Sequence, residues 1–446
     1  MEANGLTLDY VNITVEPFAF LSGDGLVDEI PELRYYGDGW GGVSGSSGAG
    51  HGGHGGLGKG QSKVGVSYGK YRRPTTFGGT GGAEVFPFTG GLGGGRFKII
   101  AHDTLVVDGA LSSKGGAARA SRSGGGSGGS ILAYTSRLHG DGEFDVSGGD
   151  GDSSTGYYGG GGGGGRICLY YRENHFLGRF LGAGGTSPYE PGGPATVFLE
   201  NVPGMNATYG HDRIDEAAHA ERIILDEEVI NGTRWTRNRT LYLNGLGRKP
   251  LDPDANLSAS YSDFSHGGSS RAWLILDDED LETNETDVEL DELQLYGGAQ
   301  LAIINPASTK ARIAIVIGQM EGDRTGRIHL GYNQTFLSLQ SYLPMDMIIY
   351  QGGLTTMQGE LLVAGVTVEV DGVLRRCQNI TVVDDGLIRM KEMYDTEGKP
   401  TTVSEMCSPR CIGVNFDAVT MILDMILPQD LSGLYEGFLT TAMLAN

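Results

Sequence analysis

Glycine constrains the fold of this chain more than any other residue, because it crowds the first 200 residues and thins out after them. The 446-residue chain contains 77 glycines, of which 54 lie in residues 1–200 and 23 in residues 201–446. Glycine loses more backbone entropy on ordering than any other residue, so this content argues against long helices in the first part. The step in glycine content predicts two regions, residues 1–200 and residues 201–446.

Glycine runs recur in the first region at nearly constant spacing. The anchor glycines Gly95, Gly129 and Gly165 lie 34 and 36 residues apart. After each anchor comes a β-branched or aromatic segment, then a turn, a second short β segment and a Gly-Gly pair. The first segments begin at Arg96, Ser130 and Arg166, a partial fourth begins at Thr196, and the second segments lie near Leu111, Phe144 and Phe180. Such self-similarity indicates a repeat architecture built from short strands.

The glycine-rich copies resemble the glycine-rich parallel β-helix repeat regions of large secreted and cell-surface proteins. The resemblance covers about residues 90–200. It rests on Gly-Gly-Arg-Ile-Cys-Leu-Tyr-Tyr at 164–171, Gly-Gly-Ser-Ile at 128–131 and Gly-Gly-Pro-Ala-Thr-Val-Phe-Leu at 192–199. It implies adhesion, matrix or filament roles and brings no catalytic residues with it.

We therefore expect an all-β chain that forms a right-handed parallel β-helix, or β-solenoid, with long glycine-rich loops. Residues 201–446 contain less glycine but keep short strand-like runs separated by Gly, Asp and Asn turns. This pattern suits a continuation of the solenoid, and it also suits a β-sandwich.

Eight Asn-x-Ser/Thr sequons occur, although the chain has only 15 asparagines and chance predicts about two. They are Asn12, Asn206, Asn231, Asn238, Asn256, Asn284, Asn333 and Asn379. This excess predicts N-linked glycans and an extracellular or cell-surface location. Met1 is not followed by the basic start and apolar core of a signal peptide, so we expect a mature segment or a piece of a longer chain.

The formal net charge of −22 argues against nucleic-acid binding, because an acidic surface repels phosphate. No apolar run reaches the ~20 residues of a membrane helix, so we expect no membrane span. Among the four cysteines, we expect a disulfide within the set Cys377, Cys407 and Cys411, and Cys168 reads as a buried strand residue.

The sequence contains only weak signals for a metal site. Ten carboxylates lie between residues 277 and 292, and Asp277, Asp278 and Asp280 begin this run. Calcium is the cation that such oxygens suit, but the spacing is neither that of the EF-hand loop nor that of the Gly-Gly-x-Gly-x-Asp repeat, and a solvated acidic loop is the commoner explanation. His51 and His54 could place two imidazoles together, yet a fixed third ligand is missing. We therefore expect no cofactor, with calcium as the one alternative left open.

These patterns favour a non-catalytic structural glycoprotein of an extracellular assembly, such as a surface filament, a hair or a matrix. Its expected partners are copies of itself or other extracellular structural proteins. Two alternatives stay open: an adhesion or glycan-binding module of a larger cell-surface protein, and a polysaccharide-active β-helix enzyme. We do not expect an enzyme, because the chain lacks a His-Glu-x-x-His motif.

Overall fold

Strands and extended glycine segments make up the part of the chain that the computed structural model describes. The described residues are 1–3, 5–27, 39, 45–83, 90–154, 156–202, 229–230, 233–234, 238–245, 271–275, 287–304, 313–331, 334–338, 340, 342–349, 354–370, 373–390 and 420–423. The chain divides into two compact units, residues 1–277 with 290–306, and residues 278–289 with 307–446.

The first unit repeats a pair of strands, one long and one short. Its strands are β1 (Gly5–Val15), β2 (Phe20–Ser22), β3 (Arg96–Val107), β4 (Ala110–Ser112), β5 (Ser130–Gly140), β6 (Glu143–Asp145), β7 (Arg166–Phe176), β8 (Arg179–Leu181), β9 (Thr196–Asn201), β10 (Val229–Ile230), β11 (Thr233–Arg234), β12 (Asn238–Asn244), β13 (Arg271–Ile275), β14 (Asp287–Tyr296) and β15 (Gln300–Ile304). The strands expected after each anchor glycine are confirmed, since β3, β5, β7 and β9 begin at the predicted residues.

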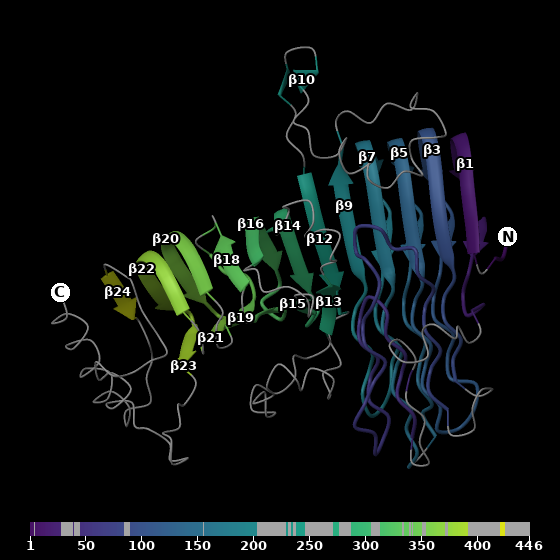
Figure 1. The fold of residues 1–446 in the computed structure, drawn as a ribbon, viewed down its shortest axis with the longest axis horizontal. Helices are drawn as coiled ribbons and strands as arrows, with labels where there is room; N and C mark the ends of the chain where they lie inside the picture. Colours follow the sequence, from purple (N-terminus) through teal and green to yellow (C-terminus); the bar gives the residue numbers. More distant parts are fainter. Residues whose placement is uncertain are drawn as a thin grey trace. The chain divides into compact units, whose positions relative to one another are not determined.

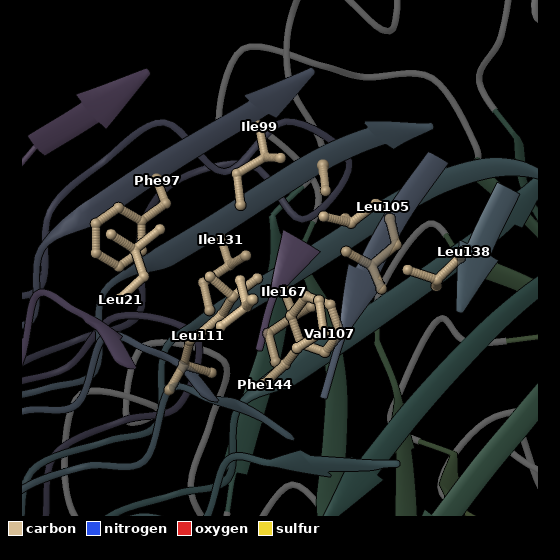
Figure 2. Packing of buried hydrophobic residues seen from close by; sticks show 14 of the residues in the cluster. Leu21, Phe97, Ile99, Leu105, Val107, Leu111, Ile131, Leu138, Phe144 and Ile167 are labelled. Carbon is tan, nitrogen blue, oxygen red and sulfur yellow. The ribbon is translucent and has the colours of Figure 1, made fainter. Parts of the chain in front are cut away.

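The long strands β1, β3, β5, β7 and β9 pair in parallel in that order (Figure 1). The short strands pair in the order β2-β4-β6-β8. The hydrophobic core of the first unit lies where the side chains of the two sheets meet. Leu111 and Phe144 from short strands pack in one cluster with Phe97, Ile131 and Ile167 from long strands (Figure 2). All five are at most 2% exposed, so the alternation of each strand points its apolar residues inward.

The glycine-rich segments between the strand pairs are not strands. We call them the glycine bundle: residues 45–58, 78–82, 90–95, 113–116, 124–129, 146–149, 159–165, 182–185 and 192–195. Figure 1 shows these segments as extended chains lying side by side beneath the long strands. Almost all of their residues are buried, so their backbone donors and acceptors must find partners within the protein.

Backbone hydrogen bonds in the bundle point in three directions in turn. The amides of Gly161 to Gly165 donate to the carbonyls of Glu190, Gly149, Ala49, Gly193 and Val146. The partner segment therefore recurs every third residue, which is the period of a polyproline II-type chain. A β-strand has a period of two, so its donors reach at most two neighbours.

Close approach of backbones explains why this part of the chain needs glycine. A Cβ atom added at Gly162 would lie 2.0 Å from the carbonyl oxygen of Gly126, well inside contact distance. A Cβ atom at Gly163 would lie 2.1 Å from the carbonyl oxygen of Gly53, on another segment. Side chains are excluded from the bundle interior on several sides of each segment.

The prediction of a right-handed parallel β-helix with long glycine-rich loops was wrong. The described strands form open sheets, and β9 pairs with β12 antiparallel, which breaks the single direction that a parallel β-helix requires. The glycine-rich segments are neither coils of a solenoid nor loops. Because glycine has no side chain, the backbones of these segments form hydrogen bonds in three directions, whereas a strand in a sheet forms them with at most two neighbours.

The second unit also alternates between two sheets. Its strands are β16 (Ile313–Gly322), β17 (Arg327–Leu330), β18 (Gln334–Ser338), β19 (Asp346–Ile349), β20 (Leu354–Ala364), β21 (Thr367–Val370), β22 (Val373–Val383), β23 (Leu387–Met390) and β24 (Thr420–Leu423). The even-numbered strands pair in parallel with one another, and so do the odd-numbered strands. Buried aliphatic side chains such as Ile317, Leu330 and Val363 form its interior.

Candidate interaction surface

An open sheet edge is the feature of the first unit best suited to bind another protein. β1 lies at the end of the strand order, and within the described residues β3 is its one strand partner. Leu6, Leu8 and Ile13 of β1 pack against the hydrophobic core, so the strand is firmly part of the sheet. Its outer edge presents backbone N–H and C=O groups of the kind that pair with a further strand.

Apolar side chains are exposed beside this edge. Tyr10 and Val11, in the middle of β1, are 61% and 62% exposed. Phe18, in the turn after β1, is 93% exposed, and Phe20 of β2 is 64% exposed. Single exposed apolar residues are common in soluble proteins, but several close together in sequence beside an open edge indicate an interaction surface.

The edge strand lacks the usual protection against pairing. Natural edge strands often contain lysine, proline or inward charges, and β1 contains no lysine, arginine or proline. Its one carboxylate, Asp9, accepts a hydrogen bond from Nε2 of His102 at 2.7 Å. Residues 1–200 hold 15 basic and 19 acidic residues, so most of the chain's negative charge lies after them. Electrostatic repulsion at this edge is correspondingly weak.

The inward-facing pattern of β1 changes halfway along the strand. Tyr10 pairs with Ala101 of β3 and Asn12 pairs with Thr104, so β3 has a bulge whose extra residue lies opposite Val11. At this point β1 changes which residues face inward, from Leu6 and Leu8 before it to Ile13 and Val15 after it. Bulges are designed features of edges and often re-aim side chains.

The buried polar groups of the glycine bundle form a closed network with a structural role. Nδ1 of His51 lies 2.7 Å from the carbonyl oxygen of Gly128, and Nε2 lies 2.8 Å from Oγ1 of Thr76. Burial, together with the Arg166 cation, lowers the pKa of His51 to about 3, so the ring is neutral at physiological pH. Its ring lies 4.7 Å from that of Tyr68, measured between centroids.

Arg166 is fully buried in the same network. Its Nε donates to the carbonyl oxygen of Tyr68 at 3.0 Å, and its Nη1 donates to Oγ1 of Thr196 at 3.0 Å. Burial lowers the pKa of Arg166 to about 10, which still leaves it protonated at neutral pH. These contacts join strand β7 to the segment that contains Tyr68 and to strand β9, and they leave the guanidinium facing protein rather than solvent.

Cys168 is a buried free thiol, as its strand context predicted. Its Sγ lies 3.1 Å from the carbonyl oxygen of Arg72, and burial raises the pKa of the thiol well above its usual range. A thiol held in its protonated form is a poor nucleophile.

The described residues contain three of the predicted glycosylation sites. Asn12 in β1 and Asn238 at the start of β12 are exposed. Asn379 lies in β22, where the backbone alone is described. The remaining sequons, Asn206, Asn231, Asn256, Asn284 and Asn333, lie outside the described residues.

The disulfide and calcium predictions fall largely outside the described residues too. Cys377 lies in β22 with its side chain undescribed, and Cys407 and Cys411 lie beyond the described range. Asp277, Asp278 and Asp280 also lie outside it. Within the residues that the structure describes, no group of three or more His, Cys, Asp or Glu side chains could hold a metal ion, and no helix could cross a membrane.

The open edge of β1 was missed by the sequence reasoning above. A usable signal was present, because residues 6–15 form a long apolar–polar run without lysine, arginine or proline. Sequence alone does not show that this run ends a sheet. Comparison with protein-family models, with curated proteins and with solved structures gives no match to this chain.

Proposed function

We propose that this chain is a non-catalytic structural glycoprotein of an extracellular assembly, such as a surface filament, a hair or a matrix. The observation that supports this proposal most is the three-directional hydrogen bonding of the glycine bundle. A block tied together by its own backbone resists deformation in every direction across the segments. It offers few side chains for chemistry, which fits a mechanical role better than a catalytic one.

Two further observations support the proposal. The buried polar groups His51, Arg166 and Cys168 are engaged with backbone or neighbouring side chains and face no solvent. The sequon at Asn238 lies at an exposed position. An open edge at β1 supplies a surface for association with a neighbouring subunit.

Electron microscopy of the native protein, located with a specific antibody in the extracellular fraction, tests the structural role. We expect regular polymers or a continuous matrix containing the chain. Isolated particles at every concentration would contradict the proposal and favour the adhesion or glycan-binding alternative. A glycan array would then be the next measurement.

Mass spectrometry of glycopeptides tests the location separately. Enzymatic removal of N-glycans in ¹⁸O-labelled water marks each occupied asparagine by a mass increase. We expect the label at Asn238 in native protein, and its absence from protein made in a bacterial cytoplasm. An unlabelled Asn238 in native protein would count against an extracellular glycoprotein.

A further inference from the structure

The chemistry of strand β1 is nearly the same when read from either end. About a centre between Tyr10 and Val11, the residues match as similar or compatible pairs. The pairs are Leu6 with Val15, Thr7 with Thr14, Leu8 with Ile13, Asp9 with Asn12, and Tyr10 with Val11. Two such strands laid antiparallel would match apolar with apolar, threonine with threonine and an aromatic with a β-branched residue. Cross-strand pairs of these kinds stabilise sheets.

A break in the alternation of β1 makes this match possible in three dimensions. Residues that face each other across an antiparallel pair point to the same face of the sheet. In a regular strand, Leu8 and Ile13 are an odd number of residues apart and would point to opposite faces. β1 breaks its alternation between Leu8 and Ile13, opposite the bulge of β3, and this removes the conflict: Leu6, Leu8 and Ile13 all pack on the same core and Val15 is buried in it.

The charges fit the same arrangement. The only carboxylate of the strand, Asp9, would face an unglycosylated Asn12 of the second copy rather than a second Asp9. Thr7 and Thr14 are exposed on the polar face and would face each other twice, once on each side of the axis. Nothing in this register places like charges opposite one another.

We propose that β1 pairs antiparallel with β1 of a second copy of this chain, about a two-fold axis between Tyr10 and Val11. The pair joins two sheets edge to edge and covers Tyr10 and Val11 at the axis. An isologous contact of this kind uses the same surface on both subunits and closes on itself. The inference rests on the proposed structural role and names the subunit contact within it.

Paired charge substitutions at the two exposed threonines test both the contact and its register. The full chain is made in a bacterial cytoplasm, without glycans, and its dimer dissociation constant is measured by analytical ultracentrifugation. In the double variant Thr7→Glu with Thr14→Glu, glutamates face each other at two places. We expect the dissociation constant to rise about tenfold or more, since like charges directly opposite destabilise a strand pair.

The matched control is Thr7→Glu with Thr14→Lys. It changes the same two exposed positions, but each glutamate now faces a lysine of the partner. We expect its dissociation constant to stay within about threefold of the unaltered chain, and the difference between the two variants to shrink at 1 M salt. Thermal unfolding of both variants at a dilution where each is monomeric verifies that both fold.

Three results would overturn the inference. They are an unaltered chain that stays monomeric up to about 100 µM, a dimer that neither double variant weakens, and a dimer that both double variants weaken equally. Regular polymers in the microscope combined with any of these would leave the structural role intact and reject the β1 contact. A dimer that the two variants affect differently, combined with isolated particles in the microscope, would support the β1 contact and reject the structural role.

Discussion

The side chain of Arg166 reaches across the fold to the backbone of Tyr68, and the donating Nε and the accepting carbonyl oxygen lie 3.0 Å apart. Arg166 begins β7, and Tyr68 lies 98 residues earlier in a segment beside the glycine bundle. The contact thus holds a sheet and a glycine-rich segment in one register. A cation buried to this degree must be hydrogen-bonded, because otherwise the free-energy cost of removing it from water exceeds the energy of its interactions in the protein.

Removing the guanidinium of Arg166 should therefore destabilise the first unit strongly. We expect Arg166→Met to lower the free energy of unfolding by about 2–4 kcal/mol, because the Tyr68 carbonyl and the Thr196 hydroxyl lose their donor. Arg179→Met is the control, since Arg179 is exposed and its ion pair with Glu143 should contribute well under about 1 kcal/mol. Urea denaturation followed by tryptophan fluorescence and circular dichroism compares the two. Equal losses would show that Arg166 has no special role.

Glycine in the bundle interior should be irreplaceable even by alanine. A methyl group at Gly162 would overlap the Gly126 carbonyl, and the backbone that surrounds it cannot yield. We expect Gly162→Ala to cost about 2–3 kcal/mol of stability or to prevent folding. Gly5→Ala is the control, because its methyl group would meet the ring of Phe77 at an ordinary 3.4 Å. Midpoints of thermal unfolding measure the difference. A fully stable Gly162→Ala protein would contradict the close packing of the bundle.

The strands of the first unit could be predicted from the sequence, because their signals are local. Each begins directly after a glycine run with β-branched or aromatic residues, so Arg96, Ser130, Arg166 and Thr196 were placed correctly as first residues. The strand-rich class followed from the same pattern and from the absence of helical periodicity. Short-range chemistry is sufficient for such elements.

The arrangement of the glycine segments could not be predicted, because it depends on contacts between distant residues. Nothing in the run Gly159–Gly165 shows that Gly163 bonds to Ala49 and Gly164 to Gly193. The same limit applies to the candidate surface, since Tyr10 and Val11 read as ordinary strand residues until β1 is seen to end the sheet. The role of His51 was also hidden, because its partners lie 25 and 77 residues away.

The thiol of Cys168 should resist alkylation in the folded protein. It is fully buried, and its raised pKa keeps it protonated at neutral pH, whereas alkylation requires an accessible thiolate. We expect iodoacetamide to leave Cys168 unmodified in native protein and to modify it fully in 6 M guanidinium, as read by peptide mass spectrometry. The same experiment tests the predicted disulfide, because a bridged pair among Cys377, Cys407 and Cys411 reacts only after reduction. Rapid labelling of native Cys168 would contradict its burial.

The neutral state of His51 predicts that stability falls on mild acidification. Its pKa is about 3 in the folded protein and near 6.5 in the unfolded chain, so between these values only the unfolded state binds the proton. The contribution is fully present above pH 6.5 and is lost as the pH falls toward 3, at about 1.4 kcal/mol per pH unit. We expect the free energy of unfolding to drop by about 2 kcal/mol from this group between pH 7 and pH 5. The His51→Gln protein has no group that titrates at this position. Its free energy of unfolding at pH 7 should be lower than that of the unaltered protein, but its decrease between pH 7 and pH 5 should be smaller by about 2 kcal/mol. Urea titrations at both pH values, on both proteins, give the two slopes. Parallel slopes would show that His51 is not the buried, neutral group that its contacts with Gly128 and Thr76 require.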